Sequence, residues 1–383
     1  MLNNGRIFYL DSMRAILMIL GILLHTANIY SPSHFWLVSG NETSILFAMI
    51  SDFINLFRMP AFFMVSGFFF VYIYRKRQRI DIVDRVFRLV IPLVFTALTL
   101  NVIQEFLVKA HYNQPLDFAR FFTEGGWVSH LWFLVNLTVY NLVVWGLFLL
   151  KPIHPLLQRT SNWLAGRYVY PFAILAFPLV ISGIYGMNRI MDIYSGFYGV
   201  TSPFLLLYYF QFFALGLLFG YSARLLDCFS RPGKLELLTF ALAYIASYAI
   251  QDRTAADSFL HDVFGAYNHS LVILFLSSMC FFLFRRFLDF RNRALGLISD
   301  SAYSIYLLHH ILVVSLGILF VEASVNMYLA YPVIVVLTFS LTMLAHQGIA
   351  RSKWLSFLLN GVRPTKFRKS SRSSHSAEAS ARQ

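Results

Sequence analysis

This chain is much more apolar than a soluble protein of its length. Of its 383 residues, 58% are hydrophobic and only 13% are charged, whereas soluble domains carry roughly 25% charged residues. A soluble fold could not bury so many apolar side chains. The net charge of +13 comes from basic residues in short clusters between apolar runs, which is typical of membrane topology and not of a nucleic-acid-binding face. We therefore expect the lipid bilayer, and no nucleic acid, as a partner.

Apolar runs long enough to cross a bilayer of about 30 Å recur ten times along the chain. They cover approximately residues 12–30, 47–73, 87–108, 130–150, 168–187, 203–223, 235–251, 268–287, 301–320 and 329–349. The pattern predicts an all-α, polytopic integral membrane protein of about ten transmembrane helices. The runs 168–187 and 235–251 are the weakest, because Pro171, Pro178 and Gly183 interrupt the first and the second is short.

The distribution of lysine and arginine predicts the orientation. If the N-terminus lies in the cytoplasm, all but five of the 31 lysines and arginines fall at cytoplasmic positions. The exceptions are Lys109, Arg120, Arg189 and Arg253 in outer loops and Arg58 within a membrane run. Because basic residues concentrate in cytoplasmic loops, we expect both termini in the cytoplasm and a multi-pass location in a bacterial inner membrane.

Composition divides the chain into a transmembrane domain, residues 1–350, and a basic cytoplasmic tail, residues 351–383. The tail is rich in Ser and Arg, most clearly from about residue 361, and this composition is typical of disorder. We therefore expect no catalytic part for it. The two cysteines, Cys228 and Cys280, are too few for a disulfide framework and fall near membrane ends that we place in the cytoplasm. We interpret them as reduced and structural.

Arg14 and His25 are ionisable residues of the first apolar run, and such residues at membrane depth usually mark functional or pairing sites. They are eleven residues apart, which is within about 20° of three full helical turns. They therefore share one helix face, about 16 Å apart along the axis. Arg14 at the cytoplasmic mouth suits a phosphate, and His25 near mid-membrane suits proton transfer or acyl attack. Alternatively, Arg14 snorkels to the surface and His25 bonds a neighbouring helix.

The second run contains a further buried cation. Arg58, Phe62 and Ser66 follow one another at four-residue steps, and Pro60 interrupts the helical hydrogen-bond ladder. A buried arginine requires an anion. That anion is either Asp52, nearby in the sequence, or a carboxylate or phosphate of a substrate.

Two later runs add histidines. His130 and Trp132 open the fourth run at the outer surface, where a Trp is ordinarily an interface anchor. His309 lies eight residues, about 12 Å, inside the ninth run, close to the expected depth of His25. Two imidazoles at this depth from different helices predict a shared cavity.

Other kinds of site leave no trace in the sequence. His34 and His111 fall in outer loops, where we expect them to be solvated. There is no metal motif with ligand spacing, no Gly-rich phosphate loop and no nucleophile elbow. We therefore expect no bound metal.

Four motifs follow one another along the chain. They are Arg14 with His25, then Phe62, Phe63, Met64, Val65, Ser66 and Gly67, then His130, Leu131, Trp132, Phe133 and Leu134, and then Ser301, Ala302, Tyr303, Ser304, Ile305, Tyr306, Leu307, Leu308 and His309. Each motif alone is weak, but the ordered set is specific and resembles the membrane acyltransferase family 3. Within that family, residues 10–14 and 52–59 are most similar to the members that add succinyl groups to periplasmic glucans.

The resemblance implies a ten-helix core that takes an acyl group from cytoplasmic acyl-CoA and delivers it to a carbohydrate hydroxyl outside. It implies succinyl or acetyl as the acyl group, with succinyl favoured, and a periplasmic glucan or another envelope polysaccharide as the acceptor. Acyl-CoA would be a co-substrate and not a permanently bound cofactor. Envelope glucan-synthesis proteins are the protein partners that the resemblance suggests.

The resemblance also assigns roles to residues. Arg14 and His25 are the expected catalytic pair, and Arg14, Ser301 and Tyr303 are expected to bind acyl-CoA. His25 would act as a general base or as a transient acyl carrier, and the sequence leaves both roles open. The expected substrate-binding residues are Arg58, Ser66, His130, Trp132 and His309.

Two rival functions fit the same pattern of helices and buried polar groups. A transporter or flippase for a glycan or lipid would move its substrate without acyl chemistry. A structural subunit of an envelope glucan assembly would use the polar residues only to pair helices, and it would tolerate changes at His25.

Overall fold

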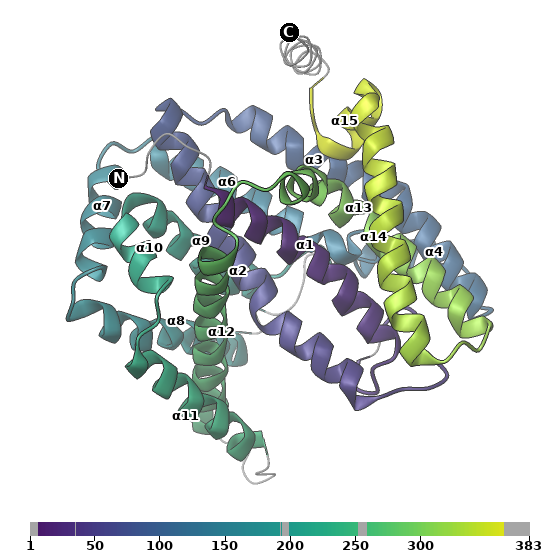
Figure 1. Cartoon of the computed structure of the whole chain (residues 1–383), viewed down its shortest axis with the longest axis horizontal. Coiled ribbons are helices and arrows are strands. Elements are labelled where there is room, and N and C mark those ends of the chain that lie inside the picture. Colours follow the sequence, from purple (N-terminus) through teal and green to yellow (C-terminus); the bar gives the residue numbers. More distant parts are fainter. Residues whose placement is uncertain (1–6, 35, 192, 194–198, 252–258, 364–383) are drawn as a thin grey trace. The chain divides into compact units, whose positions relative to one another are not determined.

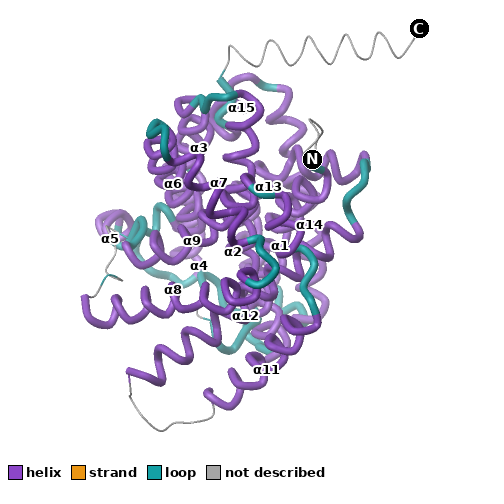
Figure 2. Tube along the Cα trace, turned by 90° about the vertical axis from the view of Figure 1, so that its left-hand side faces the viewer, coloured by secondary structure: helices purple, strands orange, loops and turns teal. Residues whose placement is uncertain are grey.

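The computed structural model describes residues 7–34, 36–191, 193, 199–251 and 259–363. Within these ranges the chain is all-α and contains no extended strand (Figure 2). In chain order the helices are α1 (Phe8–Ile29), α2 (Ile45–Arg77), α3 (Ile82–Leu98), α4 (Leu100–His111), α5 (Phe118–Thr123), the 3-10 helix η1 (Ser129–Leu131), α6 (Trp132–Phe148), α7 (Ile153–Leu164), α8 (Val169–Met191), α9 (Pro203–Tyr221), α10 (Ala223–Phe229), α11 (Lys234–Gln251), α12 (Phe259–Phe287), α13 (Arg293–Glu322), α14 (Met327–Arg351) and α15 (Lys353–Asn360) (Figure 1). The predicted fold class is confirmed.

Nine helical segments of the described chain are long and apolar enough to cross a membrane. Each coincides with one of the predicted runs, α3 with α4 forming the third and η1 with α6 the fourth. The remaining run, 235–251, forms α11, which is not among the nine. Its 18 residues begin at Lys234, include Glu236 and end at Gln251, so its apolar part is shorter. The orientation of both termini stays a prediction.

Contacts within the chain define two units. The first comprises the described residues of Met1–Leu20, Met49–Ile80 and Leu142–Ser299. The second comprises those of Gly21–Ala48, Asp81–Asn141 and Asp300–Gln383. Four helices, α1, α2, α6 and α13, therefore contribute residues to both units.

In the first unit, α2 and α9 approach each other at two glycines. A Cβ at Gly67 of α2 would come within 3.0 Å of the Phe213 carbonyl oxygen, and a Cβ at Gly216 of α9 would come as close to the Met64 carbonyl oxygen. Small residues allow membrane helices to pack this closely. Elsewhere in this unit, α8 and α11 both pack along α12. The Gly67 of the second motif thus has a packing role.

In the second unit, the chain after α14 is fastened to α3. Helix α15 packs against both α3 and α14. Gly361 ends α15 with a φ of +60°, and a Cβ there would collide with the backbone of Arg88 on α3. Arg363 pairs with Asp84, and its Nη2 lies 4.0 Å from Oδ1 of Asp81. Residues 353–363 therefore belong to the packed part of this unit.

The predicted tail, which we placed from residue 351, begins with this packed helix. Ser352 caps α15 by accepting a hydrogen bond from the Leu355 N–H, and the left-handed Gly361 ends it. Ser before a helix and Gly after it are ordinary helix boundaries. Residues 364–383 lie outside the described residues, so the disordered tail and the division into two domains stay predictions.

Both cysteines are free thiols of the first unit. Cys280 is buried on α12, and Cys228 is half-buried on α10. Burial raises the pKa of the Cys228 thiol, and this effect is larger than the opposing influence of Arg224. At neutral pH the thiol is therefore protonated, and the thiol form is a poor nucleophile.

Candidate active site

Four histidines of the second unit, His25, His130, His309 and His310, lie against one another, and we call them the histidine cluster. The ring centroid of His25 on α1 is 5.4 Å from that of His309 and 4.8 Å from that of His310. His130 in η1 stacks on His310 at 4.3 Å and lies 5.6 Å from His309. His130, His309 and His310 are buried. The structure therefore brings together His25, His130 and His309 from three predicted motifs.

Hydrogen bonds orient the rings of this cluster. Nδ1 of His309 lies 3.1 Å and 2.7 Å from two carbonyl oxygens one turn earlier on α13. Nδ1 of His310 lies 2.6 Å from Oε1 of the buried Gln104 on α4. The hydroxyl of Tyr306 donates to the carbonyl oxygen of His130 at 2.8 Å. Such partners hold the imidazoles in place, as a precise reaction geometry requires.

Trp36, in the loop after α1, covers one side of the cluster. Its ring stacks on His25 with centroids 5.6 Å apart and an interplanar angle of 22°, and it lies edge-on to His310 at 5.4 Å. The same loop is tied to the end of α13, where the Asn41 side chain donates to the Val321 carbonyl oxygen at 3.3 Å. The loop thus holds an aromatic ring against His25.

An unusual backbone presents His130 to the cluster. Ser129, directly before it, has a φ of +43°, a value that residues with a side chain seldom adopt. The Ser129 N–H donates to the Gly125 carbonyl oxygen at 3.1 Å. The Asn101 side chain of α4 donates to the Trp127 carbonyl oxygen at 2.7 Å. These bonds fix the turn, and backbone strain of this kind is concentrated at functional sites.

Three other predicted site residues lie in the same unit. The Tyr303 hydroxyl donates to the Arg88 carbonyl oxygen at 2.8 Å, which ties α13 to α3. Ser301 is buried on α13, and Trp132 is the half-buried first residue of α6. Their contact with acyl-CoA or the acceptor stays a prediction.

Arg14 belongs to the first unit and has a defined orientation there. Its guanidinium lies over the Phe69 ring of α2, 5.4 Å from the centroid. Its Nη2 lies 3.8 Å from Oδ1 of Asp11, and its side chain is 41% exposed. Because α1 is one continuous helix, Arg14 and His25 keep the helical spacing that the sequence predicts.

Arg58 and Ser66, both on α2, are also residues of the first unit. Nη2 of Arg58 lies 3.6 Å from Sδ of Met59. Pro60 is accommodated inside α2, which continues to Arg77. The roles of Arg58 and Ser66 toward a substrate stay predictions.

His111 differs from the sequence expectation. Its Nδ1 lies 2.8 Å from Oε1 of Glu322, and only 13% of its side chain is exposed. It is therefore a link between the ends of α4 and α13 and not a solvated loop residue. Among the residues that the structure describes, no group of His, Cys, Asp and Glu has an arrangement that could hold a metal ion.

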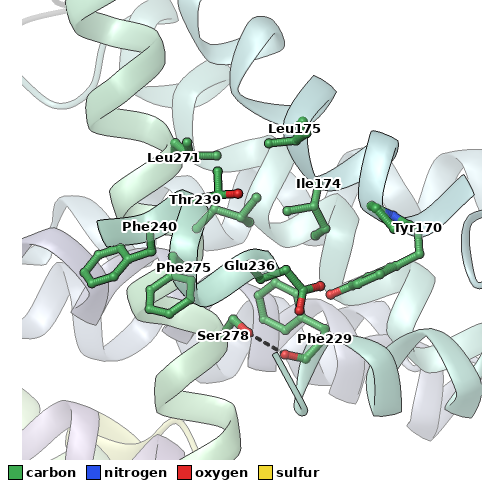
Figure 3. A pocket seen from close by; sticks show the side chains of 12 residues that line it. Tyr170, Ile174, Leu175, Phe229, Glu236, Thr239, Phe240, Leu271, Phe275 and Ser278 are labelled. Atoms are coloured by element: carbon green, nitrogen blue, oxygen red, sulfur yellow. Dashed lines mark hydrogen bonds between the residues drawn. The ribbon is translucent and has the colours of Figure 1, made fainter. Parts of the chain in front are cut away.

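The first unit contains a separate pocket (Figure 3). It is lined mainly by apolar side chains of α8, α11 and α12, together with Phe229 of α10. The Glu236 carboxylate and the Tyr170 hydroxyl point toward each other in it (Figure 3). The Ser278 hydroxyl donates to the Phe229 carbonyl oxygen at 2.6 Å. None of the predicted site residues lines this pocket, so we assign the candidate active site to the histidine cluster.

Comparison with known proteins identifies the family. A family model described as an acyltransferase domain matches residues 7–347. This chain belongs to that acyltransferase family. The matched range contains all four histidines of the cluster as well as Arg14, so the resemblance predicted from the motifs is confirmed. The chain is a membrane acyltransferase.

Curated relatives cover nearly the whole acyltransferase. Glucans biosynthesis protein C of Escherichia coli strain K12 is 27% identical in an alignment 374 residues long, which covers 93% of this chain and 94% of the relative. The proteins of the same name from Escherichia coli O157:H7 and from O81 strain ED1a have the same identity and coverage. No solved structure matches this acyltransferase significantly.

Trp36, Gln104 and His310 are members of the site that the motifs did not single out. His310 directly follows His309, so a helical wheel places it about 100° away on α13. The ring of His310 is held by tertiary contacts, among them the side-chain amide of the buried Gln104 of α4, 2.6 Å from its Nδ1. A polar residue within the third apolar run was the available signal for Gln104.

Proposed function

We propose that this acyltransferase moves an acyl group, succinyl in preference to acetyl, from cytoplasmic acyl-CoA to hydroxyls of a periplasmic glucan or another envelope carbohydrate. The histidine cluster carries this proposal, because adjoining imidazoles provide both a nucleophile and a proton acceptor. The name of the Escherichia coli relatives supports a glucan as the acceptor. Envelope proteins of glucan synthesis are the proposed partners.

In the proposed reaction, the acceptor oxygen bonds to the thioester carbonyl carbon, the C–S bond breaks, and CoA leaves as a thiol. The hydroxyl proton passes through a protein base. Arg14 would hold a CoA phosphate. Ser301 and Tyr303 are the other residues that we propose to bind acyl-CoA. His25 would meet the acyl group, either as the general base or as its transient carrier. Arg58 would bind the free carboxylate of a succinyl donor.

The test uses the purified protein in liposomes, with succinyl-CoA or acetyl-CoA and an oligomeric glucan as substrates. Mass spectrometry of the glucan should show the mass increment of one acyl group per modified hydroxyl. More hydroxyls should be modified with succinyl-CoA than with acetyl-CoA. His25→Ala should abolish it without loss of membrane insertion, because removing a polar group does not hinder insertion. His111→Gln, a histidine outside the cluster, should keep the activity. Glucan movement without a mass increment would favour the transporter.

We also propose that this membrane protein lies in the inner membrane with both termini in the cytoplasm. Reporter fusions near Arg77, Arg159 and Arg291 should then report cytoplasm, and a fusion near Gln114 should report periplasm. One inverted loop would contradict this orientation.

A further inference from the structure

The proton position on His309 follows from its neighbours. Two groups within hydrogen-bond distance of its Nδ1 are the backbone carbonyl oxygens of Ile305 at 3.1 Å and Tyr306 at 2.7 Å. A carbonyl oxygen only accepts hydrogen bonds. Nδ1 must therefore carry a proton, and in the neutral ring the lone pair lies on Nε2. The backbone of α13 thus selects the tautomer of His309 in which Nε2 is the basic nitrogen.

His310 lacks this constraint. Its Nδ1 lies 2.6 Å from Oε1 of Gln104, and a glutamine amide can present either its oxygen or its nitrogen after a rotation of the amide. The backbone of α13 therefore fixes the basic nitrogen of His309, whereas a rotatable side chain sets that of His310. This difference singles out His309 within the cluster.

His309 is also enclosed by groups that belong to the proposed reaction centre. Its side chain is almost fully buried. The titratable rings that face it are His25 from α1 at 5.4 Å, His130 from η1 at 5.6 Å, and Tyr306 and His310 of its own helix, both at 6.1 Å. The ring of His309 is therefore next to that of His25, the histidine of the first motif.

We propose, on the basis of the acyl transfer proposed above, that Nε2 of His309 is the proton acceptor of that reaction. As the acceptor oxygen bonds to the acyl carbon, its O–H bond breaks and Nε2 of His309 takes the proton. The C–S bond of the thioester breaks and its electron pair stays on sulfur. The thiolate then takes the proton from His309, which returns to the neutral ring. His25 is thereby left to contact the acyl group.

His309→Gln tests this assignment in the full-length protein in liposomes. General-base catalysis is worth on the order of 10²- to 10⁴-fold, so kcat should fall by that factor while KM for succinyl-CoA stays within about twofold. In the wild type, kcat should fall towards low pH as the base becomes protonated, and the variant should lose this fall. Because His25, His130, His310 and Tyr306 face the same ring, the profile is compared with that of His310→Gln. His111→Gln serves as the matched control outside the cluster.

A second variant separates proton transfer from a structural role. Imidazole added to His309→Ala should restore turnover, and substituted imidazoles should restore it in the order of their basicity. Nitrogen NMR of histidine-labelled protein, with His309→Gln used for assignment, should show a protonated Nδ1 and an unprotonated Nε2 at neutral pH.

Wild-type kcat and an unchanged pH profile in His309→Gln would overturn the assignment while leaving acyl transfer intact. A protonated Nε2 on neutral His309 would overturn it as well, and so would an inserted but inactive His309→Ala that no imidazole rescues. A wild-type protein that acylates no glucan would overturn the proposed function itself.

Discussion

The close approach of α2 and α9 predicts that alanine at Gly67 destabilises the first unit. The Cβ of the new side chain would collide with the Phe213 carbonyl oxygen, which is a backbone atom and cannot rotate away. The two helices would have to separate by roughly 1 Å to restore an ordinary carbon–oxygen distance. Alanine at Gly216 would collide in the same way with the Met64 carbonyl oxygen.

The magnitude follows from two opposing effects. Overpacking of a close interface costs about 1–3 kcal/mol, whereas replacing Gly by Ala within a helix gains about 1 kcal/mol. Gly183→Ala isolates the gain, because a Cβ at Gly183 on α8 would meet no atom within 4 Å. Gly67→Ala should therefore be less stable than Gly183→Ala by about 1–3 kcal/mol. At roughly 2–4 °C per kcal/mol, this is a difference of about 2–12 °C in melting temperature.

The assay is thermal unfolding of the purified variants in one detergent at one heating rate, followed by intrinsic fluorescence. The same heating rate is needed because unfolding of membrane proteins is often irreversible. Gly67→Ala with Gly216→Ala should cost less than the sum of the single variants, because one separation of the helices relieves both collisions.

A Gly67→Ala protein as stable as Gly183→Ala would refute the close approach of α2 and α9. Strict additivity of the two single variants would show instead that each glycine has a separate role. The first outcome would return the Gly67 of the second motif to a functional explanation.

Arg14→Lys should keep part of the acyl transfer with weaker acyl-CoA affinity, because lysine keeps the charge but loses the planar fork that binds phosphate; an unchanged KM for acyl-CoA in a titration would show that Arg14 only snorkels. Cys228 should react slowly with a maleimide at pH 7 and faster as the pH rises, because a raised thiol pKa lowers the thiolate fraction at neutral pH; rapid labelling at pH 7 would contradict this. A chain cut after Arg363 should keep its melting temperature and activity, whereas a cut after Gly361 should lower the melting temperature because it removes the ion pair with Asp84.

Helical spacing explains why part of the site was predictable. The eleven-residue interval between Arg14 and His25 has the same geometry in any continuous helix, and α1 is continuous. The depth of His309 in its run likewise follows from the rise per residue. From these two estimates we expected His25 and His309 at a similar depth, and their rings lie 5.4 Å apart; the cavity that they were expected to share stays a prediction.

Contacts between distant segments could not be predicted from the sequence. The turn at Ser129 has a backbone conformation that no local propensity favours, and it depends on bonds such as that from Asn101 to Trp127. Likewise, a glycine such as Gly67 indicates a close helix contact, but the sequence does not show which helix packs there. The helix α15, by contrast, could have been predicted from the sequence, because Ser352 and Gly361 are helix-boundary residues. We read this segment by its tail-like composition instead.

The side chains of the histidine cluster come from distant helices, which explains why the motifs of this family are spread along almost the entire chain. His25 comes from α1, Gln104 from α4, His130 from η1 and His309 with His310 from α13, so the groups that meet are up to 285 residues apart in the sequence. No short segment contains a complete site, since α13 supplies two rings but neither His25 nor the partner of His310. Any shortened protein that omits either α1 or α13 would therefore lose the cluster. This is a physical reason for a family match that extends from residue 7 to residue 347.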